Sequence, residues 1–166
     1  MTDRDRHPQQ TFKGVRVTFT ATQSCSAPPE KVFPLLCPIR EYEYIPAWEC
    51  DVVYLGSGFA ENGGVFTTKL PGDGEGKDLW VISRYEPNHM VEFVRVSEMR
   101  AMLYRIELQR TEEGGTSVAW EQVLTGLSEK GNHHVKNLRQ SDFTAMIGQV
   151  EKWMQHYLET GMMMTQ

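Results

Sequence analysis

The sequence has little cysteine, no long apolar run and no excess of positive charge. Its three cysteines are odd in number and lack the CxxC spacing of zinc or redox sites, so we expect buried thiols in a reducing cytoplasm. No stretch of 18 apolar residues occurs, which argues against a membrane-spanning helix. The formal net charge is -5 and the 17 Lys and Arg residues are scattered, so nucleic acid is not an expected partner.

The histidines do not indicate a metal site, and the N-terminal segment does not resemble a secretory signal. His7, His89 and His156 stand alone, and the adjacent His133 and His134 lack the further ligands that a metal ion needs. No metal and no other cofactor is therefore expected. The first ten residues are charged and contain no apolar core of the kind that a secretory signal needs, so a cytoplasmic protein is expected.

The apolar residues that are present suffice for one ordinary domain. The 166 residues are 40% hydrophobic, and a chain of about 150 residues buries roughly two thirds of its unfolded surface. We expect a flexible N-terminal segment at 1–12, one domain over 13–161 and a short tail at 162–166.

Alternation and helical spacing indicate the elements in the first part of the chain. The stretch "GVRVTFTATQ" (14–23) alternates apolar and polar residues, as a half-buried strand does. In "SAPPEKVFPLLC" (26–37), Ser26 can cap a short helix whose first turn accepts prolines, and further prolines keep it to two or three turns. A second short helical piece is expected at about 40–44.

Six β-type segments follow Trp48, and Gly, Pro, Asn or charged residues end each of them. Their sequences are "CDVVYLG", "GVFTTKL", "DLWVISRYE", "MVEFVRV", "AMLYRIELQR" and "TSVAWEQVLTG". The loop at 71–78 contains three glycines and four charges, so we expect it to bury nothing.

The last 30 residues change to a helical period. An apolar stripe recurs at steps of three and four residues from Phe143 to Leu158. With Asn132 as N-cap and Gly161 as stop, it predicts one helix of about 27 residues, about 40 Å long at 1.5 Å per residue. Since no other helix of comparable length exists to receive the stripe, this helix must lie on the sheet.

The resulting order is strand, two short helices, six strands and one long helix. It predicts an α+β fold in which a seven-stranded curved antiparallel sheet wraps around the long C-terminal helix. The two short helices after the first strand would close one end of the resulting cup. Such a cup holds either its own side chains or a ligand.

Several stretches follow one another as they do in a known superfamily. They are "APPEKVFPLL", "YIPAW", "WVISRYEP", "VEFVRV", "GGTSVAWEQVLTGLSEKG" and the C-terminal amphipathic helix. Together, over 13–161, they resemble the START-like, Bet v 1-like (SRPBCC) superfamily, which includes polyketide cyclase-like and lipid-transfer proteins. The resemblance implies a helix-grip fold with a deep pocket between the sheet and the C-terminal helix. It implies no single function, because this scaffold carries binding, transport and several enzymatic chemistries.

Parity along the strands indicates which side chains line the cup. In the segment at 101–110, Arg105, Glu107 and Gln109 share one face, so the other face, which includes Tyr104, should look inward. The same alternation places Trp120 and Gln122 together as a buried apolar and polar pair. The cavity-lining set that we expect is Tyr44, Trp48, Phe93, Arg95, Met102, Tyr104, Ile106, Trp120, Gln122, Phe143, Met146, Ile147, Val150 and Trp153.

Arg95 gives the sharpest specific hypothesis. One of Arg95 and Glu92 should point toward the cavity, and the alternative is that Arg95 lies outside on the convex face. A buried charge is costly unless it is paired or touches a ligand. If Arg95 faces inward, it is therefore a candidate anchor for a ligand carboxylate or enolate.

The stretch "REYEYIPAW" (40–48) is unusually rich in aromatic residues for a connection between elements. Tyr42, Tyr44 and Trp48 could form one wall of the pocket mouth, or they could seal the end of the core. Aromatic side chains serve both purposes. His133 and His134 likewise fit either a general base or a solvated helix terminus, and no nucleophile or catalytic triad can be assembled.

Three functions fit such a fold. The first is a module that binds a hydrophobic small molecule, such as a lipid, polyketide or aromatic metabolite, for carriage or sensing. The second is a cyclase- or hydratase-type enzyme that acts on a polyketide-like substrate in the same cavity. The third is an interaction protein with a filled cavity and an exposed apolar patch. We expect the first, in a monomer or homodimer.

Overall fold

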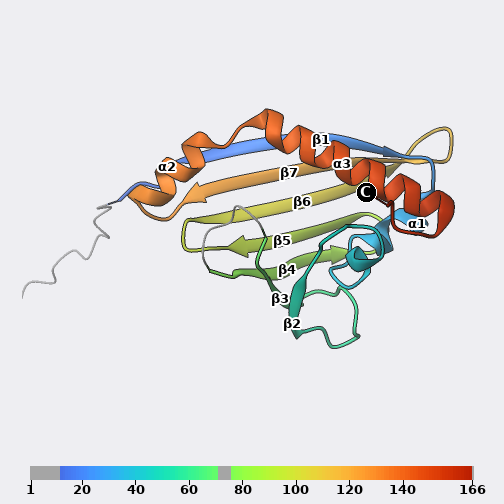
Figure 1. Ribbon diagram of the computed structural model, residues 1–166, viewed down its shortest axis with the longest axis horizontal. Helices are drawn as coiled ribbons and strands as arrows, with labels where there is room; N and C mark the ends of the chain where they lie inside the picture. The colour runs from blue at the N-terminus through green and yellow to red at the C-terminus, as the bar shows by residue number, and fades with distance from the viewer. Residues whose placement is uncertain (1–11, 71–75, 166) are drawn as a thin grey trace, which may run out of the picture.

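The computed structural model describes residues 12–70 and 76–165 (Figure 1). Its strands (β), α-helices (α) and 3-10 helices (η) follow in the order β1 (Arg16–Cys25), α1 (Pro29–Val32), η1 (Phe33–Leu35), η2 (Arg40–Glu43), β2 (Cys50–Tyr54), β3 (Val65–Thr68), β4 (Asp78–Glu86), β5 (Met90–Val96), β6 (Arg100–Arg110), β7 (Thr116–Gly126), α2 (Glu129–Asn137) and α3 (Gln140–Thr160). The expected flexible segment at 1–12 lies, apart from Phe12, outside the described residues.

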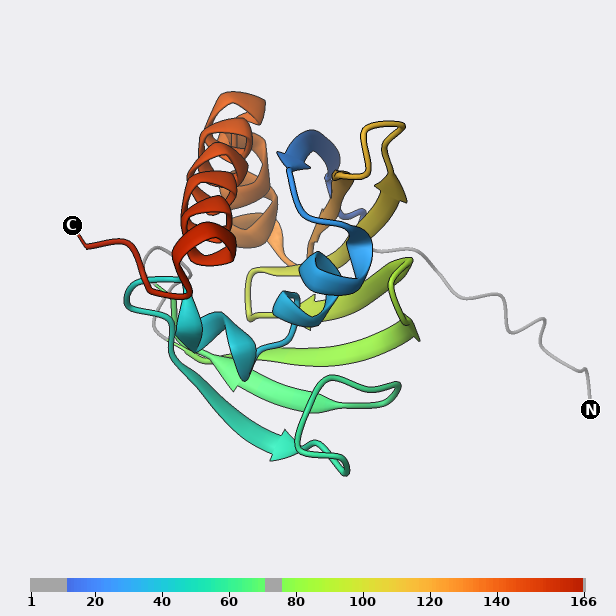
Figure 2. The same ribbon diagram turned by 90° about the vertical axis from the view of Figure 1, so that its right-hand side faces the viewer.

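The seven strands form one antiparallel sheet in the order β1-β7-β6-β5-β4-β3-β2. Figure 2 shows that the sheet curves around α3, while the short helices after β1 close one end of the curve. The helices of the C-terminal third pack on the first and last strands, α3 on β1 and α2 on β7. The predicted α+β helix-grip architecture is confirmed.

The inward face of the sheet is built from rows of side chains that lie opposite one another on neighbouring strands. Two of these rows on β5, β6 and β7 consist of Arg95, Met102 and Leu124, and of Phe93, Tyr104 and Gln122. All of these side chains are buried, as the alternation predicts. Arg95 therefore faces inward, and the alternative position on the convex face is wrong.

Side chains of α3 bind the open edge of β1. Gln140 accepts a hydrogen bond from the Thr20 amide and donates one to the Thr20 carbonyl, at 3.3 and 2.7 Å. Further along, Glu151 accepts from the Ser24 amide at 3.0 Å. Because these bonds satisfy backbone groups that an edge strand would otherwise expose, α3 both covers the core and protects this edge of the sheet.

The predicted single helix of about 27 residues is wrong. Leu138 and Arg139 have extended backbone, with ψ of 147° and 140°, and they separate α2 from α3. No proline or glycine marks this break in the sequence. Its physical reason is tertiary, because α2 packs on β7 while α3 turns to follow β1. The predicted stop is correct, since Gly161 ends α3 with a φ of 70°.

Two predicted helix caps are also wrong. Ser128, and not Asn132, caps α2 by accepting a hydrogen bond from the Gly131 amide at 3.0 Å. The Asn132 amide instead bridges α2 to the chain before β1: its oxygen accepts from the Val15 amide at 2.7 Å and its nitrogen donates to the Lys13 carbonyl at 3.1 Å. Pro28 and not Ser26 precedes α1.

The expectation that 71–78 buries nothing is wrong for Asp78. This residue begins β4 and is only 1% exposed. The part of that loop at 71–75 lies outside the described residues. Within 12–70 and 76–165, none of the helices combines the length and apolar content needed to cross a membrane.

The close packing of α2 gives a prediction about two helical glycines. A Cβ at Gly131 would lie 2.1 Å from the Met99 carbonyl oxygen, so Gly131→Ala should lower the free energy of unfolding by more than about 2 kcal/mol. At Gly148 in α3, a Cβ would have no described atom within 4 Å outside its own helix. Gly148→Ala should therefore raise the free energy of unfolding by roughly 0.5–1 kcal/mol.

Urea denaturation of both variants measures these changes. Equal effects at the two positions would contradict the packing of α2 against the turn at Met99.

Candidate functional site

A continuous series of aromatic rings crosses the concave face of the sheet. Each ring centroid lies 5.3 to 6.4 Å from that of another member. We call this set the aromatic series, and its members are Phe66, Trp80, Phe93, Tyr104, Trp120, Phe143 and Phe19. It joins β3, β4, β5, β6, β7, α3 and β1 through one apolar layer.

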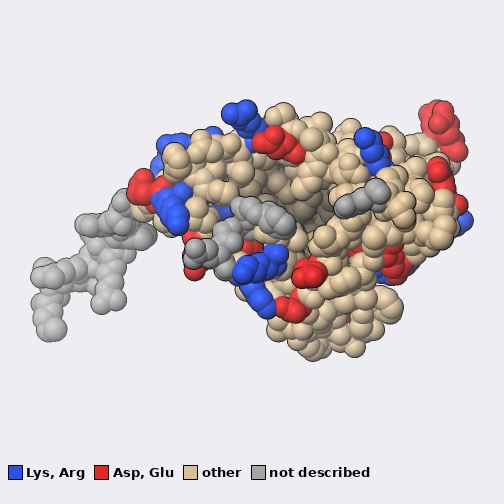
Figure 3. Space-filling model, viewed as in Figure 1, with Lys and Arg blue, Asp and Glu red and all other residues tan. Residues whose placement is uncertain are grey.

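A cavity of about 360 Å³ lies between the sheet and the junction of α2 and α3. The face of the molecule seen in Figure 3 is hollowed between α3 and the strands below it. The cavity wall consists of Phe19, Arg95, Arg100, Met102, Gln122, Leu124, His134, Leu138, Arg139, Asp142, Phe143 and Met146. Half of these residues are apolar and half are polar or charged, and the volume lies in the range of small-molecule sites.

Two buried arginines on this wall share one carboxylate. The Arg95 Nε donates to Asp78 Oδ2 at 2.6 Å, and both terminal nitrogens of Arg100 lie 3.3 Å from the same oxygen. Arg95 is 7% exposed, Arg100 3% and Asp78 1%. A buried charge needs such partners, because its desolvation otherwise costs several kcal/mol.

Trp80 fixes the orientation of Arg95. The guanidinium carbon lies 4.5 Å from the centroid of the indole ring, in a cation–π arrangement. The indole nitrogen in turn donates to the Thr68 hydroxyl at 2.8 Å. Arg95 is therefore held from one side by a carboxylate and from another by an aromatic face, which leaves its position on the cavity wall well defined.

Glu41 on η2 is a second candidate group that the sequence did not indicate. Its carboxyl makes no hydrogen bond or ion pair with any residue in 12–70 or 76–165. Burial raises its pKa from 4.5 to about 8. The residue as a whole is half-buried. Such a carboxyl is mostly protonated at neutral pH.

Tyr104 lies in the electrostatic field of Glu41. Burial and then the charge of Glu41 raise the pKa of the Tyr104 hydroxyl, whereas a hydrogen bond from Gln122 and the charge of Arg95 lower it. Tyr104 and Gln122 face each other across β6 and β7. Tyr104 and Glu41 thus both have raised pKa values, and perturbed groups of this kind are frequent in functional sites.

The aromatic residues of 40–48 direct their polar atoms at the backbone. Tyr44 donates to the Leu35 carbonyl at 3.2 Å, and the Trp48 indole donates to the Pro38 carbonyl at 2.8 Å. The Tyr42 hydroxyl contacts both the amide and the carbonyl of Cys50, at 2.9 and 3.1 Å. These contacts favour the interpretation of the stretch as a seal at the closed end of the core.

The structure brings only part of the predicted lining set to the cavity. The members on its wall are Arg95, Met102, Gln122, Phe143 and Met146. Three more lie beside it in the aromatic series: Phe93, Tyr104 and Trp120. The others belong to the core or pack against it: Tyr44, Trp48, Ile106, Ile147, Val150 and Trp153. A ligand contact by any of them stays a prediction.

Sequence reasoning missed several groups of the site, above all Arg100 and Asp78. A signal existed for Arg100, which precedes Met102 and Tyr104 by two and four positions and so shares their inward parity. Asp78 looked like part of a charged loop. For Glu41, in a 3-10 helix of four residues, no periodic pattern was available.

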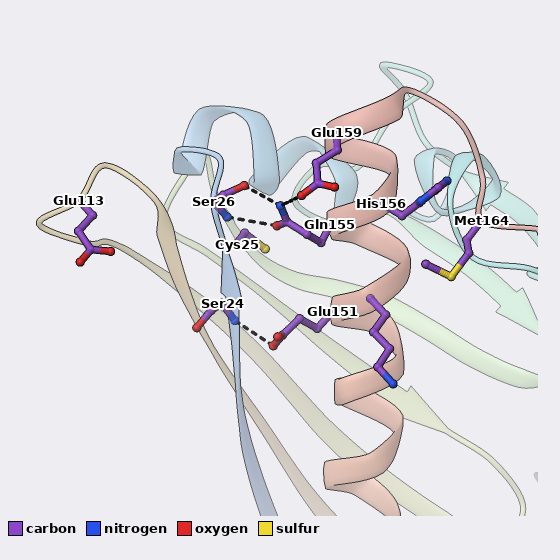
Figure 4. A pocket seen from close by; sticks show the side chains of 10 residues that line it. Ser24, Cys25, Ser26, Glu113, Glu151, Gln155, His156, Glu159 and Met164 are labelled. Atoms are coloured by element: carbon purple, nitrogen blue, oxygen red, sulfur yellow. Dashed lines mark hydrogen bonds between the residues drawn. The ribbon is translucent and has the colours of Figure 1, made fainter.

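A larger surface hollow of about 590 Å³ lies between the end of β1 and the C-terminal half of α3 (Figure 4). Gln155 spans it, bonding the backbone amide and the hydroxyl of Ser26 and also Glu159. Burial raises the pKa of the Cys25 thiol there to about 11, which makes it a poor nucleophile. The side chains of this hollow therefore connect the end of β1 to α3, and its cysteine is not an activated nucleophile.

The three cysteines are free thiols, with Cys25 and Cys37 buried as predicted and Cys50 half-buried. Among the residues that the structure describes, no group of three or more His, Cys, Asp or Glu side chains could hold a metal ion.

Comparison of the structure with solved structures finds many similar chains. A protein from Mesorhizobium loti, MLL2253, is 17% identical with a TM-score of 0.61, over 86% of this chain and 97% of that one. Ara h 8.0201 is 15% identical with a TM-score of 0.62, over 88% and 99%. At such identities the likeness concerns the fold.

A point mutant of Thalictrum norcoclaurine synthase, in complex with a transition-state analogue, is 10% identical with a TM-score of 0.61, over 89% of this chain and 99% of that one. No protein-family model matches the sequence, and no curated protein matches it either.

The raised pKa of Glu41 predicts a pH dependence of stability. Since the carboxyl ionises near pH 4.5 in the unfolded chain and near 8 in the folded one, the folded state loses stability as the pH rises between these values. Glu41→Gln removes this loss. We compare the free energy of unfolding of the variant with that of the wild type at each pH. This difference should be about 1–3 kcal/mol more in favour of the variant at pH 8.5 than at pH 5.

Urea denaturation at the two pH values measures the difference, with Glu49→Gln as a control at an exposed position nearby. If Glu41→Gln and Glu49→Gln respond identically to pH, the carboxyl of Glu41 does not lie in a buried environment.

Proposed function

We propose that this chain, which has the Bet v 1-like helix-grip fold, binds a hydrophobic small molecule in the cavity between the sheet and the α2–α3 junction. The observation that carries the proposal is the composition of the cavity wall. Phe19, Met102, Leu124, Phe143 and Met146 supply apolar surface, and burial of apolar ligand surface contributes roughly 25 cal/mol per Å².

Carriage or sensing is the function that this arrangement supports best. The apolar wall provides binding energy, and the buried polar groups next to it provide orientation. Lipids, polyketides and aromatic metabolites are the classes that such a wall suits. We further propose a cytoplasmic location, in keeping with the free thiols, and a monomer or homodimer as the working state.

Uptake of N-phenyl-1-naphthylamine, a neutral aromatic probe, tests the proposal. The wild type should bind one molecule, detected by fluorescence and by native mass spectrometry. Met146 lines the cavity and is 44% exposed, so an indole at this position can enter the cavity without disrupting the core. Met146→Trp should weaken probe binding by about 10-fold or more.

Leu103→Trp is the matched control, because Leu103 is 46% exposed and lies on the outward face of β6. It should leave binding unchanged. Equal weakening by both substitutions, or no uptake by the wild type, would exclude the cavity as the binding site.

A cyclase- or hydratase-type enzyme is a second candidate, and one observation favours it. Glu41 has a pKa of about 8 and lies close enough to Tyr104 to affect its pKa. A carboxyl with such a pKa can exchange a proton with a ligand near neutral pH. A norcoclaurine synthase with the same fold was captured with a transition-state analogue, and we propose acid–base chemistry on a carbonyl ligand as the corresponding alternative here.

Proton exchange of 2-tetralone in D₂O, followed by NMR, tests this alternative without knowledge of the substrate. A base within reach of the bound ketone should accelerate exchange of its acidic protons, and if Glu41 is that base, Glu41→Gln should remove about 100-fold of the acceleration. Glu49→Gln serves again as control. An unchanged exchange rate in Glu41→Gln would leave binding alone as the function.

A further inference from the structure

We infer that the ligand carries an anionic oxygen group, such as a carboxylate, and that this group lies against Arg95 and Arg100 on the cavity wall. The inference rests on the proposed binding function and adds to it the charge of the ligand and its orientation. It follows from where the charged side chains lie on the cavity wall.

The first observation is the position of two guanidinium groups. Arg95 and Arg100 both form part of the wall, and both are more than nine-tenths buried. They come from neighbouring strands, β5 and β6, and a single oxygen of Asp78 holds them together. A planar guanidinium is the protein group that best matches a carboxylate or phosphate, because its N–H groups form paired hydrogen bonds.

The second observation is that these groups are held in place before any ligand arrives. Asp78 fixes both arginines, and the ring of Trp80 supports Arg95 at 4.5 Å. Side chains of this length otherwise lose rotamer entropy on binding, at a cost of about 0.5–1.5 kcal/mol each. Prior ordering removes most of that cost.

The third observation is the balance of charge around the cavity. Arg95, Arg100 and Arg139 line it, whereas Asp142 on the wall and Asp78, which pairs with both buried arginines, are acidic. His134 also lies on the wall. Basic side chains around a hollow with apolar walls favour an anion, because the low dielectric strengthens their field.

The apolar residues fix the direction of the ligand. Phe19, Phe143 and Met146 form the part of the wall contributed by β1 and α3, while the two buried arginines, Arg95 and Arg100, come from β5 and β6. A bound amphiphile would therefore place its apolar body under α3 and its acidic group against the sheet. The Gln122 amide, on β7 between these parts, can bond to either an anionic or a carbonyl oxygen.

Two probes with the same ring system test the inference. They are 8-anilino-1-naphthalenesulfonate and N-phenyl-1-naphthylamine, which differ only in the sulfonate. The wild type should bind the sulfonate at least about 10-fold more tightly, because a charge-assisted hydrogen bond contributes more than a neutral one. Competition by 1-naphthoate and by 1-naphthyl phosphate then distinguishes a carboxylate from a phosphate as the preferred anion.

Three arginine variants locate the anion. Arg100→Met should weaken binding of the sulfonate at least about 10-fold more than it changes binding of the neutral probe. Because Arg100 is buried against Asp78, this variant requires a check of folding by circular dichroism. Arg139→Gln provides a second test at an exposed position on the same cavity, with a smaller loss of about 2- to 5-fold.

Arg105→Met is the matched control, since Arg105 lies on the outward face of β6 and pairs with Glu92. It should affect neither probe. Equal affinity for the two probes, or losses in Arg139→Gln that match those in Arg105→Met, would overturn the anionic site while the binding function stands. Failure of the wild type to bind either probe would overturn both.

Discussion

The buried carboxylate of Asp78 is the interaction on which the cavity depends. One of its oxygens receives both Arg95 and Arg100, and these come from different strands of the sheet. Without it, two guanidinium groups would lie together in a region from which water is largely excluded, and such an arrangement costs several kcal/mol. The ion pairs therefore allow the wall of an otherwise aromatic cup to carry charge. They also set the position of that charge, because Asp78 begins β4 and cannot move independently of the sheet.

The interior of the cup serves different purposes at its two ends. At the end near α2, the wall combines the arginines with Gln122 and apolar residues around an open volume of about 360 Å³. At the other end, Tyr44 and Trp48 bind backbone carbonyls and close the core. The aromatic series crosses the sheet from strand to strand between them. The charge of Glu41 on η2 also contributes to the raised pKa of Tyr104.

The sequence was sufficient for the fold because alternation and periodicity are properties of successive residues. The inward set of β6 and β7 and the stop at Gly161 follow directly from such patterns. The break at Leu138 and Arg139 could not be foreseen, since it results from packing on different strands and not from a helix-breaking residue. The pairing of Asp78 with Arg95 joins positions 17 residues apart, and the burial of Glu41 depends on the whole cup. Neither the ion pair nor the burial of Glu41 can be predicted from the neighbouring residues in the sequence.

The hydrogen bonds from α3 to β1 determine how the cup can open. Gln140 and Glu151 bind backbone groups of β1 along its length, so we expect α3 and β1 to move together as one unit. The opposite margin of the sheet is built differently: four of the five residues of β2 are exposed, on both of its faces. Local opening of the sheet should therefore be easiest at β2, at the margin opposite the one that α3 holds.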